Sequence, residues 1–271
     1  MFLLPYDITY ESLQAIAKKN QHMRYSKFTL NIVVLTLLLF TIAPEIYSET
    51  PYKKSLYNSF INREMFKWGN IIRTMDTGKS TTVDQKLELI NYYYGYIGYL
   101  IGKKQNDIAI KMIPKGEKLI HQVLLVSPKN ATALAFKGSF LGFRIGISKL
   151  KTFALSRQSF ADINRAYALD PQNFQAIIDK GNLLYYSPGI LGGDKEEALK
   201  YYLKGSRILE KNKETDQNWV YLNLLTTIAM AYDKTDNPLQ AKLICEKLLR
   251  KEPNYRWMKD VYYPALLEKT R

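Results

Sequence analysis

The sequence has few of the residues that bind metals or act as catalytic nucleophiles. It contains one cysteine, Cys245, and two histidines, of which only His121 lies beyond residue 48. No His/Cys pair has the spacing of a metal site, and a Ser-His-Asp arrangement would have to use His121. A single cysteine also excludes an intramolecular disulfide, and its position in a helical apolar stripe is typical of core packing. We therefore expect no metal, no cofactor and no enzymatic activity.

Other signatures of chemistry are incomplete. The stretch from Thr77 to Thr81 resembles the end of a phosphate-binding loop, but Arg73 stands where that loop needs its first glycine and no hydrophobic strand precedes it. We interpret the stretch as a turn between helices. No acidic residue lies in a Gly-rich or apolar context that would suggest a raised pKa. An unrecognised enzyme remains the third hypothesis, which carboxylates clustered around His121 would favour.

Basic residues are in excess but are not concentrated. The formal net charge is +14, with 39 Lys and Arg against 25 Asp and Glu. Pairs such as Lys53-Lys54 and Lys103-Lys104 recur among acidic residues, and no long basic block contains interleaved aromatic residues. The distribution predicts a solvated surface and no nucleic-acid partner.

One long apolar run occurs near the start of the chain. Residues 28–43 contain no charge, Arg24 and Lys27 precede them, and the small Ser48 follows. This order is typical of a secretory signal, and a start at Met23 would give it a compact basic end. We therefore expect residues 1–48 to be a leader and the protein to be exported, so that it is periplasmic. If the run is not cleaved, it contacts the membrane and anchors the protein on the outer side of the inner membrane.

The remaining residues, 49–271, contain a repeated sequence pattern. Pro128 and Pro171 are 43 residues apart and Pro253 follows 82 later, which leaves room for two units of about 41. Each unit opens with a helix in which a small residue stands three positions before an apolar one. The four instances are Ile97-Gly98-x2-Ile101, Lys137-Gly138-x2-Leu141, Lys180-Gly181-x2-Leu184 and Ile228-Ala229-x2-Tyr232. A small residue lets the partner helix approach closely. With no strand-like alternation of useful length, the fold class is all-α.

The last unit resembles the tetratricopeptide repeat (TPR). Leu225, Ile228, Ala229, Tyr232, Ala241, Cys245 and Pro253 follow that motif in order, whereas earlier units match it more loosely. The resemblance implies an α-solenoid of divergent TPR-like helix pairs. We expect helix starts at Asp194, Asn237-Pro238 and Pro114, a leading helix from Tyr52 to Met75 and a terminal cap from Tyr255.

A narrower stretch is similar to a second family. Residues 185–194, with Pro188, Gly192, Gly193 and Asp194, look like a loop of the T-component proteins associated with TRAP transporters. That resemblance implies a periplasmic helical protein that handles a small hydrophobic or acidic ligand for a transporter. Similar loops elsewhere only turn the chain and cap the next helix.

The first helices of such solenoids line the concave, binding face. Residues one, four and five positions after each small residue should face it. This selects as candidate binding residues Tyr99, Lys103, Phe143, Asn182, Tyr185 and Tyr186. The alternative interpretation is that the tyrosines only cover the long first helices. A clamp for a terminal carboxylate is not expected, because only Asn182 is of the required type.

The leading hypothesis is an exported TPR-like scaffold that binds a protein or peptide of the cell envelope. The alternative is a T-component-like periplasmic protein that handles a small-molecule ligand. An open groove would favour the first hypothesis, and a closed apolar pocket would favour the second.

Overall fold

The computed structural model describes residues 51–77, 82–147 and 152–270. The chain divides into two units, Met1–Thr50 and Pro51–Arg271, and every described residue belongs to the second. The predicted leader and its apolar run 28–43 therefore lie outside them. None of the described helices is long and apolar enough to cross a membrane.

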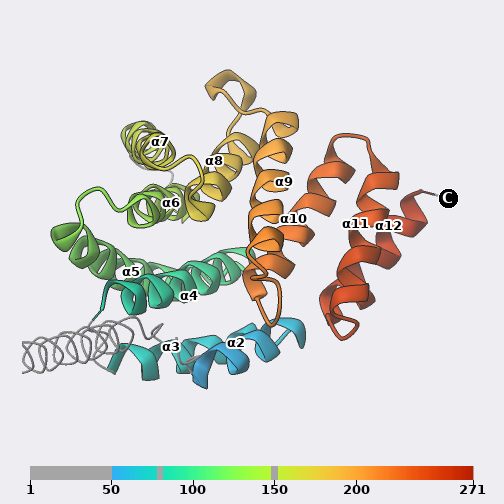
Figure 1. Ribbon diagram of the computed structural model, residues 1–271, viewed down its shortest axis with the longest axis horizontal. Helices are drawn as coiled ribbons and strands as arrows, with labels where there is room; N and C mark the ends of the chain where they lie inside the picture. Colours follow the sequence, from blue (N-terminus) through green and yellow to red (C-terminus); the bar gives the residue numbers. More distant parts are fainter. Residues whose placement is uncertain (1–50, 78–81, 148–151, 271) are drawn as a thin grey trace, which may run out of the picture. The chain divides into compact units, whose positions relative to one another are not determined.

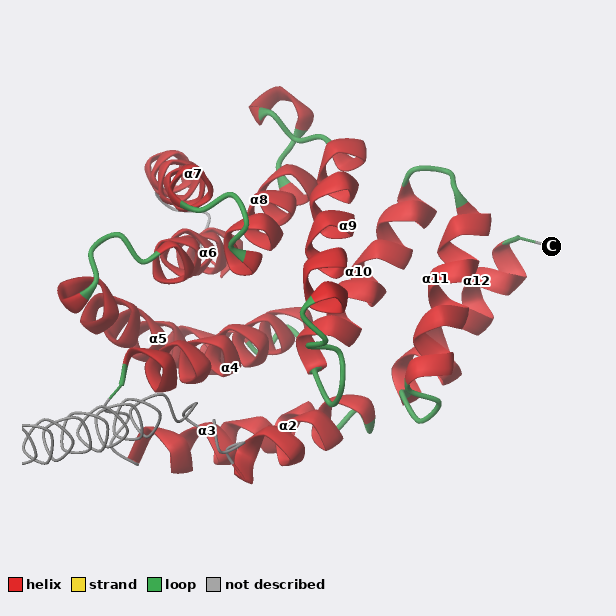
Figure 2. Cartoon of the chain, viewed as in Figure 1, coloured by secondary structure: helices red, strands yellow, loops and turns green. Residues whose placement is uncertain are grey.

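The second unit is built from helices, and the described residues contain no strand (Figure 2). The all-α prediction is confirmed. The α-helices are α2 (Pro51–Ile61), α3 (Trp68–Thr77), α4 (Val83–Gly102), α5 (Asn106–Val126), α6 (Ala131–Ile147), α7 (Thr152–Leu169), α8 (Phe174–Tyr186), α9 (Lys195–Lys211), α10 (Trp219–Lys234), α11 (Pro238–Lys251) and α12 (Tyr263–Lys269). Short 3-10 turns span Met65–Lys67 and Gly189–Leu191, and a π-helical turn spans Met258–Tyr262 just before α12.

The helices pack as consecutive pairs, α4 with α5, α6 with α7, α8 with α9 and α10 with α11 (Figure 1). Each second helix also contacts the first helix of the next pair, and α6 contacts both α4 and α8. This arrangement confirms the predicted TPR-like α-solenoid. The first helices α4, α6 and α8 are therefore neighbours along one side of the array.

The small residues of the motif do not all serve the same purpose. A Cβ atom at Gly138 would lie 2.5 Å from Ile163 Cγ1 and 2.9 Å from the Ser159 carbonyl oxygen, so α6 and α7 touch there as predicted. At Gly98, by contrast, a Cβ atom would meet nothing within 4 Å. The prediction that Gly98 faces its partner helix is wrong. In α4 it is Gly95 that is crowded, by Trp68 and Trp219.

The predicted helix starts have mixed outcomes. Asp194 caps α9, because its Oδ1 accepts a hydrogen bond of 2.9 Å from the Glu197 amide. Pro238 is in the first turn of α11, although the side chain of Asn237 makes no capping bond. The start predicted at Pro114 is wrong, since α5 begins at Asn106 and contains this proline in its interior. The helix continues past the missing N–H because buried residues on both sides of it hold α5 against its neighbours.

The predicted leading helix is broken in two. It is interrupted between Ile61 and Trp68, where Arg63 has a positive φ of 63°. The Trp68 Nε1 then donates to the Leu56 carbonyl oxygen at 3.0 Å and folds α3 back beside α2. The turn expected at 77–81 lies almost wholly outside the described residues, but α3 does end at Thr77 and α4 begins at Val83.

The broken segment joins the two ends of the repeat array. While α3 contacts α4 of the first pair, α2 contacts α10 of the last. The Phe60 ring stacks on Tyr255 with centroids 5.1 Å apart, and Trp68 meets Trp219 edge-on at 5.0 Å. The Tyr57 hydroxyl donates to Glu252 at 2.7 Å. Burial of these rings stabilises a closure that an isolated row of repeats would not have.

Candidate binding cavity

The first helices surround a cavity of about 1110 Å³. Its walls come from α4, α6, α7, α8 and α10. Phe60 of α2, Tyr202 of α9 and two residues after α11, Tyr255 and Trp257, also line it, together with Met65 and three residues of the loop after α8. The contacts that join the ends of the array therefore also form part of the wall.

Most of the wall is apolar. On α4 and α6 it is formed partly by glycines whose Cβ positions are open space, namely Gly98, Gly102, Gly142 and Gly146. Aromatic side chains supply much of the rest, namely Tyr94, Tyr99, Phe143, Phe160, Phe174, Trp219 and Trp257. A cavity with such walls suits a ligand that is largely apolar and can lie flat against the helix backbone.

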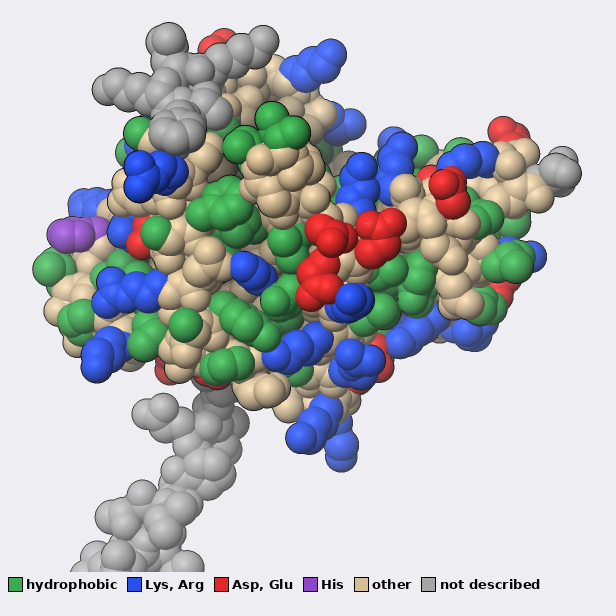
Figure 3. All heavy atoms as spheres, turned by 90° about the horizontal axis from the view of Figure 1, so that it is seen from above, with side chains coloured by type: hydrophobic (Ala, Val, Ile, Leu, Met, Phe, Trp, Pro, Cys, Tyr) green, Lys and Arg blue, Asp and Glu red, His purple; other side chains and the backbone are tan. Residues whose placement is uncertain are grey.

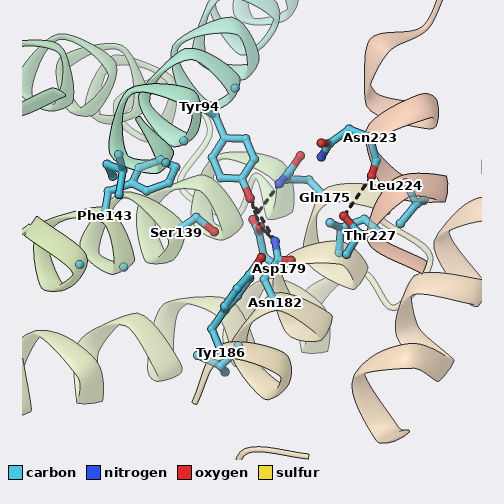
Figure 4. A pocket seen from close by; sticks show the side chains of 18 of the residues that line it. Tyr94, Ser139, Phe143, Gln175, Asp179, Asn182, Tyr186, Asn223, Leu224 and Thr227 are labelled. Atoms are coloured by element: carbon cyan, nitrogen blue, oxygen red, sulfur yellow. Dashed lines mark hydrogen bonds between the residues drawn. The ribbon is translucent and has the colours of Figure 1, made fainter. Parts of the chain in front are cut away.

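A polar cluster stands on the α8 side, centred on Asp179 (Figure 4). The Asp179 side chain is fully buried. Its Oδ2 accepts from Gln175 Nε2 at 2.8 Å, and its Oδ1 accepts from Asn182 Nδ2 at 3.3 Å and from the Tyr94 hydroxyl at 3.5 Å. Every one of these donors is neutral, so the carboxyl group is hydrogen-bonded but not neutralised.

Burial raises the pKa of Asp179 to about 7, although the hydrogen bonds from Gln175, Ser139, Asn182 and Tyr94 oppose the rise. The prediction that no acidic residue has an apolar context is therefore wrong. The local sequence held a signal, because Ile177 and Ile178 directly precede this aspartate. In the folded protein Asp179 is buried inside the solenoid, two positions before the motif glycine Gly181.

The structure brings four of the six predicted binding residues onto the cavity wall. These are Tyr99, Phe143, Asn182 and Tyr186. Lys103 is not among them, because it follows the last residue of α4 and is exposed. Tyr185 turns away to pack against Tyr202, with ring centroids 6.1 Å apart. That the four residues bind a ligand stays a prediction.

Other wall residues were not predicted from the sequence. Trp219, Trp257 and Phe60 come from outside the motif positions, and Phe160 comes from a second helix. His121 is exposed on α5, whereas Cys245 is fully buried and its pKa is raised to about 12 by burial, as packing implies. Within the described ranges, no group of three or more His, Cys, Asp or Glu side chains could hold a metal ion.

Comparison with known proteins defines the class through the fold. No protein-family model matches the sequence, and no curated protein matches it either. The HusA haemophore of Porphyromonas gingivalis has a similar structure, with a TM-score of 0.54, 13% identity, and coverage of 71% of this chain and 96% of HusA. TTC0263, a TPR protein of Thermus thermophilus, gives a TM-score of 0.50 at 10% identity and covers 80% of this chain and 96% of its own. The chain is a TPR-like helical repeat protein.

Proposed function

We propose that this chain binds a largely apolar small molecule in the cavity between its first helices, and that it acts as a ligand carrier. The observation that supports this most directly is the largely apolar cavity lined by α4, α6, α7, α8 and α10, with Phe60 of α2 in its wall. Its volume of about 1110 Å³ is slightly above the usual range of small-molecule sites, about 300–1,000 Å³.

The closure weighs against the peptide-docking hypothesis. An extended peptide lying along the concave face would have to pass the Phe60, Tyr255 and Trp219 rings, which bridge the ends of the array. The fold similarity to HusA agrees with a carrier, since that protein is described as a haemophore. The TPR fold itself is compatible with binding either proteins or small ligands.

A fluorescence titration of the full chain with N-phenyl-1-naphthylamine, a neutral apolar probe, tests the proposal. We expect saturable binding of about one probe per chain. Gly98→Phe combined with Gly142→Phe should abolish it, because both new rings would project into open cavity space. Ala161→Phe, on the exposed face of α7, is the matched control. Binding that survives the double substitution contradicts the proposal, and a co-purifying protein that still binds the filled variant would restore the docking scaffold.

We also propose that the protein is exported, with residues 28–43 as the signal or anchor. The support is the order of basic, apolar and small residues in the sequence. Cell fractionation with mass spectrometry of the N-terminus tests it. A chain beginning near Glu49 in the periplasmic fraction indicates cleavage, and a membrane-bound chain that retains residues 28–43 indicates an anchor. A full-length chain in the cytosolic fraction contradicts export.

A further inference from the structure

The charge of the cavity differs from that of the outer surface. On the face shown in Figure 3, Lys and Arg side chains are dispersed among acidic and apolar ones, in a chain whose net charge is +14. The described residues that line the cavity include no Lys, Arg or His, and Asp179 is their only carboxyl group. A strongly basic protein thus has a single, buried acidic group among the described residues of its cavity wall.

Two basic side chains of the helices around Asp179, Lys180 of α8 and Lys137 of α6, are occupied elsewhere. Lys180 is hydrogen-bonded to Asn164 of α7, and Lys137 of α6 pairs with Asp162 at 3.0 Å. A fully buried carboxylate with only neutral donors keeps much of its desolvation cost, which an opposite charge would offset. Asp179 lines the cavity without exposed surface, so a cation would pair with it by displacing one of the neutral donors, of which the Tyr94 hydroxyl is the most distant, at 3.5 Å.

The surroundings of Asp179 are hydrogen-bonded and aromatic. Asn182 donates to the Tyr94 hydroxyl at 3.0 Å and accepts from the Tyr202 hydroxyl at 3.0 Å, so both of its polar atoms are engaged. The Tyr94 ring also lies 5.2 Å from Phe143. Aromatic faces attract cations within about 6 Å. The hydrogen-bond network therefore positions the carboxyl group beside aromatic rings.

Resting on the proposed function, we infer that the cavity selects ligands that join an apolar or aromatic body to a protonated amine, and that the amine pairs with Asp179. The apolar body would lie along the glycine-lined walls of α4 and α6. A ligand with a carboxylate or phosphate would meet no basic group among the described lining residues and would be repelled by Asp179. Of the two ligand types that the T-component resemblance implies, hydrophobic and acidic, the acidic one fits poorly.

The pairing makes binding depend on pH. Below about pH 7 the Asp179 carboxyl takes up a proton, and affinity for an amine should fall by about tenfold for each further pH unit. The titratable groups that interact with it are Tyr94 from α4 and Tyr202 from α9, with Tyr186 of α8 beside them. Burial raises the pKa of all three hydroxyls, so they stay neutral in this range. The contribution of α6 is the neutral Ser139.

Three ligands of matched size test the inference: 1-naphthylmethylamine, 1-naphthalenemethanol and 1-naphthaleneacetate, titrated calorimetrically into the full chain at pH 7.5. We expect the amine to bind at least tenfold more tightly than the alcohol and the acetate most weakly. Asp179→Asn should reduce the preference for the amine to twofold or less, and circular dichroism verifies its fold. Asp233→Asn, outside the cavity and paired with Lys269 at 2.6 Å, should keep the preference.

The remaining outcomes distinguish failure of the inference about Asp179 from failure of the proposed function. Equal binding of all three ligands, or tightest binding of the acetate, overturns the inference and leaves the cavity as a ligand site. Failure of these ligands and of the neutral probe alike overturns the proposed function and the inference with it. A preference for the amine that persists in Asp179→Asn overturns the assigned role of Asp179.

Discussion

Gly98 in α4 and Gly138 in α6 occupy the same place in the repeat motif, but their surroundings are opposite. Gly138 lies against the backbone of α7, whereas Gly98 opens onto the cavity. In α4 the crowded glycine is instead Gly95, three positions earlier, where Trp68 and Trp219 of the joined ends of the array pack against the helix. The comparison shows that one small-residue motif can serve helix packing in one repeat and line a binding cavity in another.

Removing Trp219, which packs against Gly95 of α4, should have the largest effect. Trp219→Ala deletes a buried ring that contacts both Trp68 and Phe60. We expect the free energy of unfolding to fall by about 4 kcal/mol, as for other buried tryptophans, and probe binding to weaken because the cavity opens. Urea unfolding followed by circular dichroism measures the first effect.

Trp257→Ala is the control for Trp219→Ala, since Trp257 is only half-buried and stacks on Tyr262 alone, at 5.3 Å. Trp257→Ala should lower the free energy of unfolding clearly less than Trp219→Ala does. Equal losses from the two substitutions would mean that the contact between the ends of the array is not what stabilises this part of the fold.

Gly138→Leu should disrupt the packing of α6 against α7. Its Cβ would lie 2.9 Å from the Ser159 carbonyl oxygen, which is backbone and cannot move without shifting α7. We expect a loss of about 3 kcal/mol in unfolding free energy. Gly142→Leu, one turn further along the same helix, meets open space and should not destabilise the protein. If the two variants unfold alike, α6 does not distinguish a packed face from a cavity face.

These contrasts also show what the sequence could reveal. The helix pairs repeat at short range, so the spacing of Pro128, Pro171 and the small residues was enough to predict the all-α solenoid. The closure was not predictable in this way, because Tyr57 and Glu252 are 195 residues apart and no local pattern links them. Asp179 was missed because an aspartate in a helix is usually exposed, and its burial depends on residues from three other helices.

Counting one, four or five residues beyond the small residue of the motif predicted cavity-wall positions only where the helix continued that far. It placed Asn182 and Phe143 correctly, because α8 and α6 continue as regular helices past the motif glycine. It failed at Lys103, where α4 has already ended.

The polar side of the cavity should make stability depend on pH. Asp179 keeps its proton in the folded chain up to about pH 7, whereas in the unfolded chain it loses it near 3.8. Between these values the folded state binds more protons, so the free energy of unfolding falls as pH rises, by at most about 1.4 kcal/mol per pH unit. Asp179→Asn should remove this slope. Unfolding at pH 4.5, 6 and 7.5 measures it, with Asp233→Asn as the control that retains it. An unchanged slope in Asp179→Asn would show that this carboxyl is not desolvated.

The smallest expected effect is that of a substitution at Gly98, the glycine that faces the cavity. Gly98→Ala adds a methyl group where nothing lies within 4 Å, so it should gain roughly 0.5–1 kcal/mol of stability from helix propensity alone. The same methyl group would keep a flat ligand from touching the α4 backbone, and we expect the probe to bind about twofold more weakly. Stability and affinity would then change in opposite directions at one atom, as expected where a residue is retained for function. A loss of stability would instead place Gly98 against a neighbouring helix, like Gly138, and the two glycines would no longer differ.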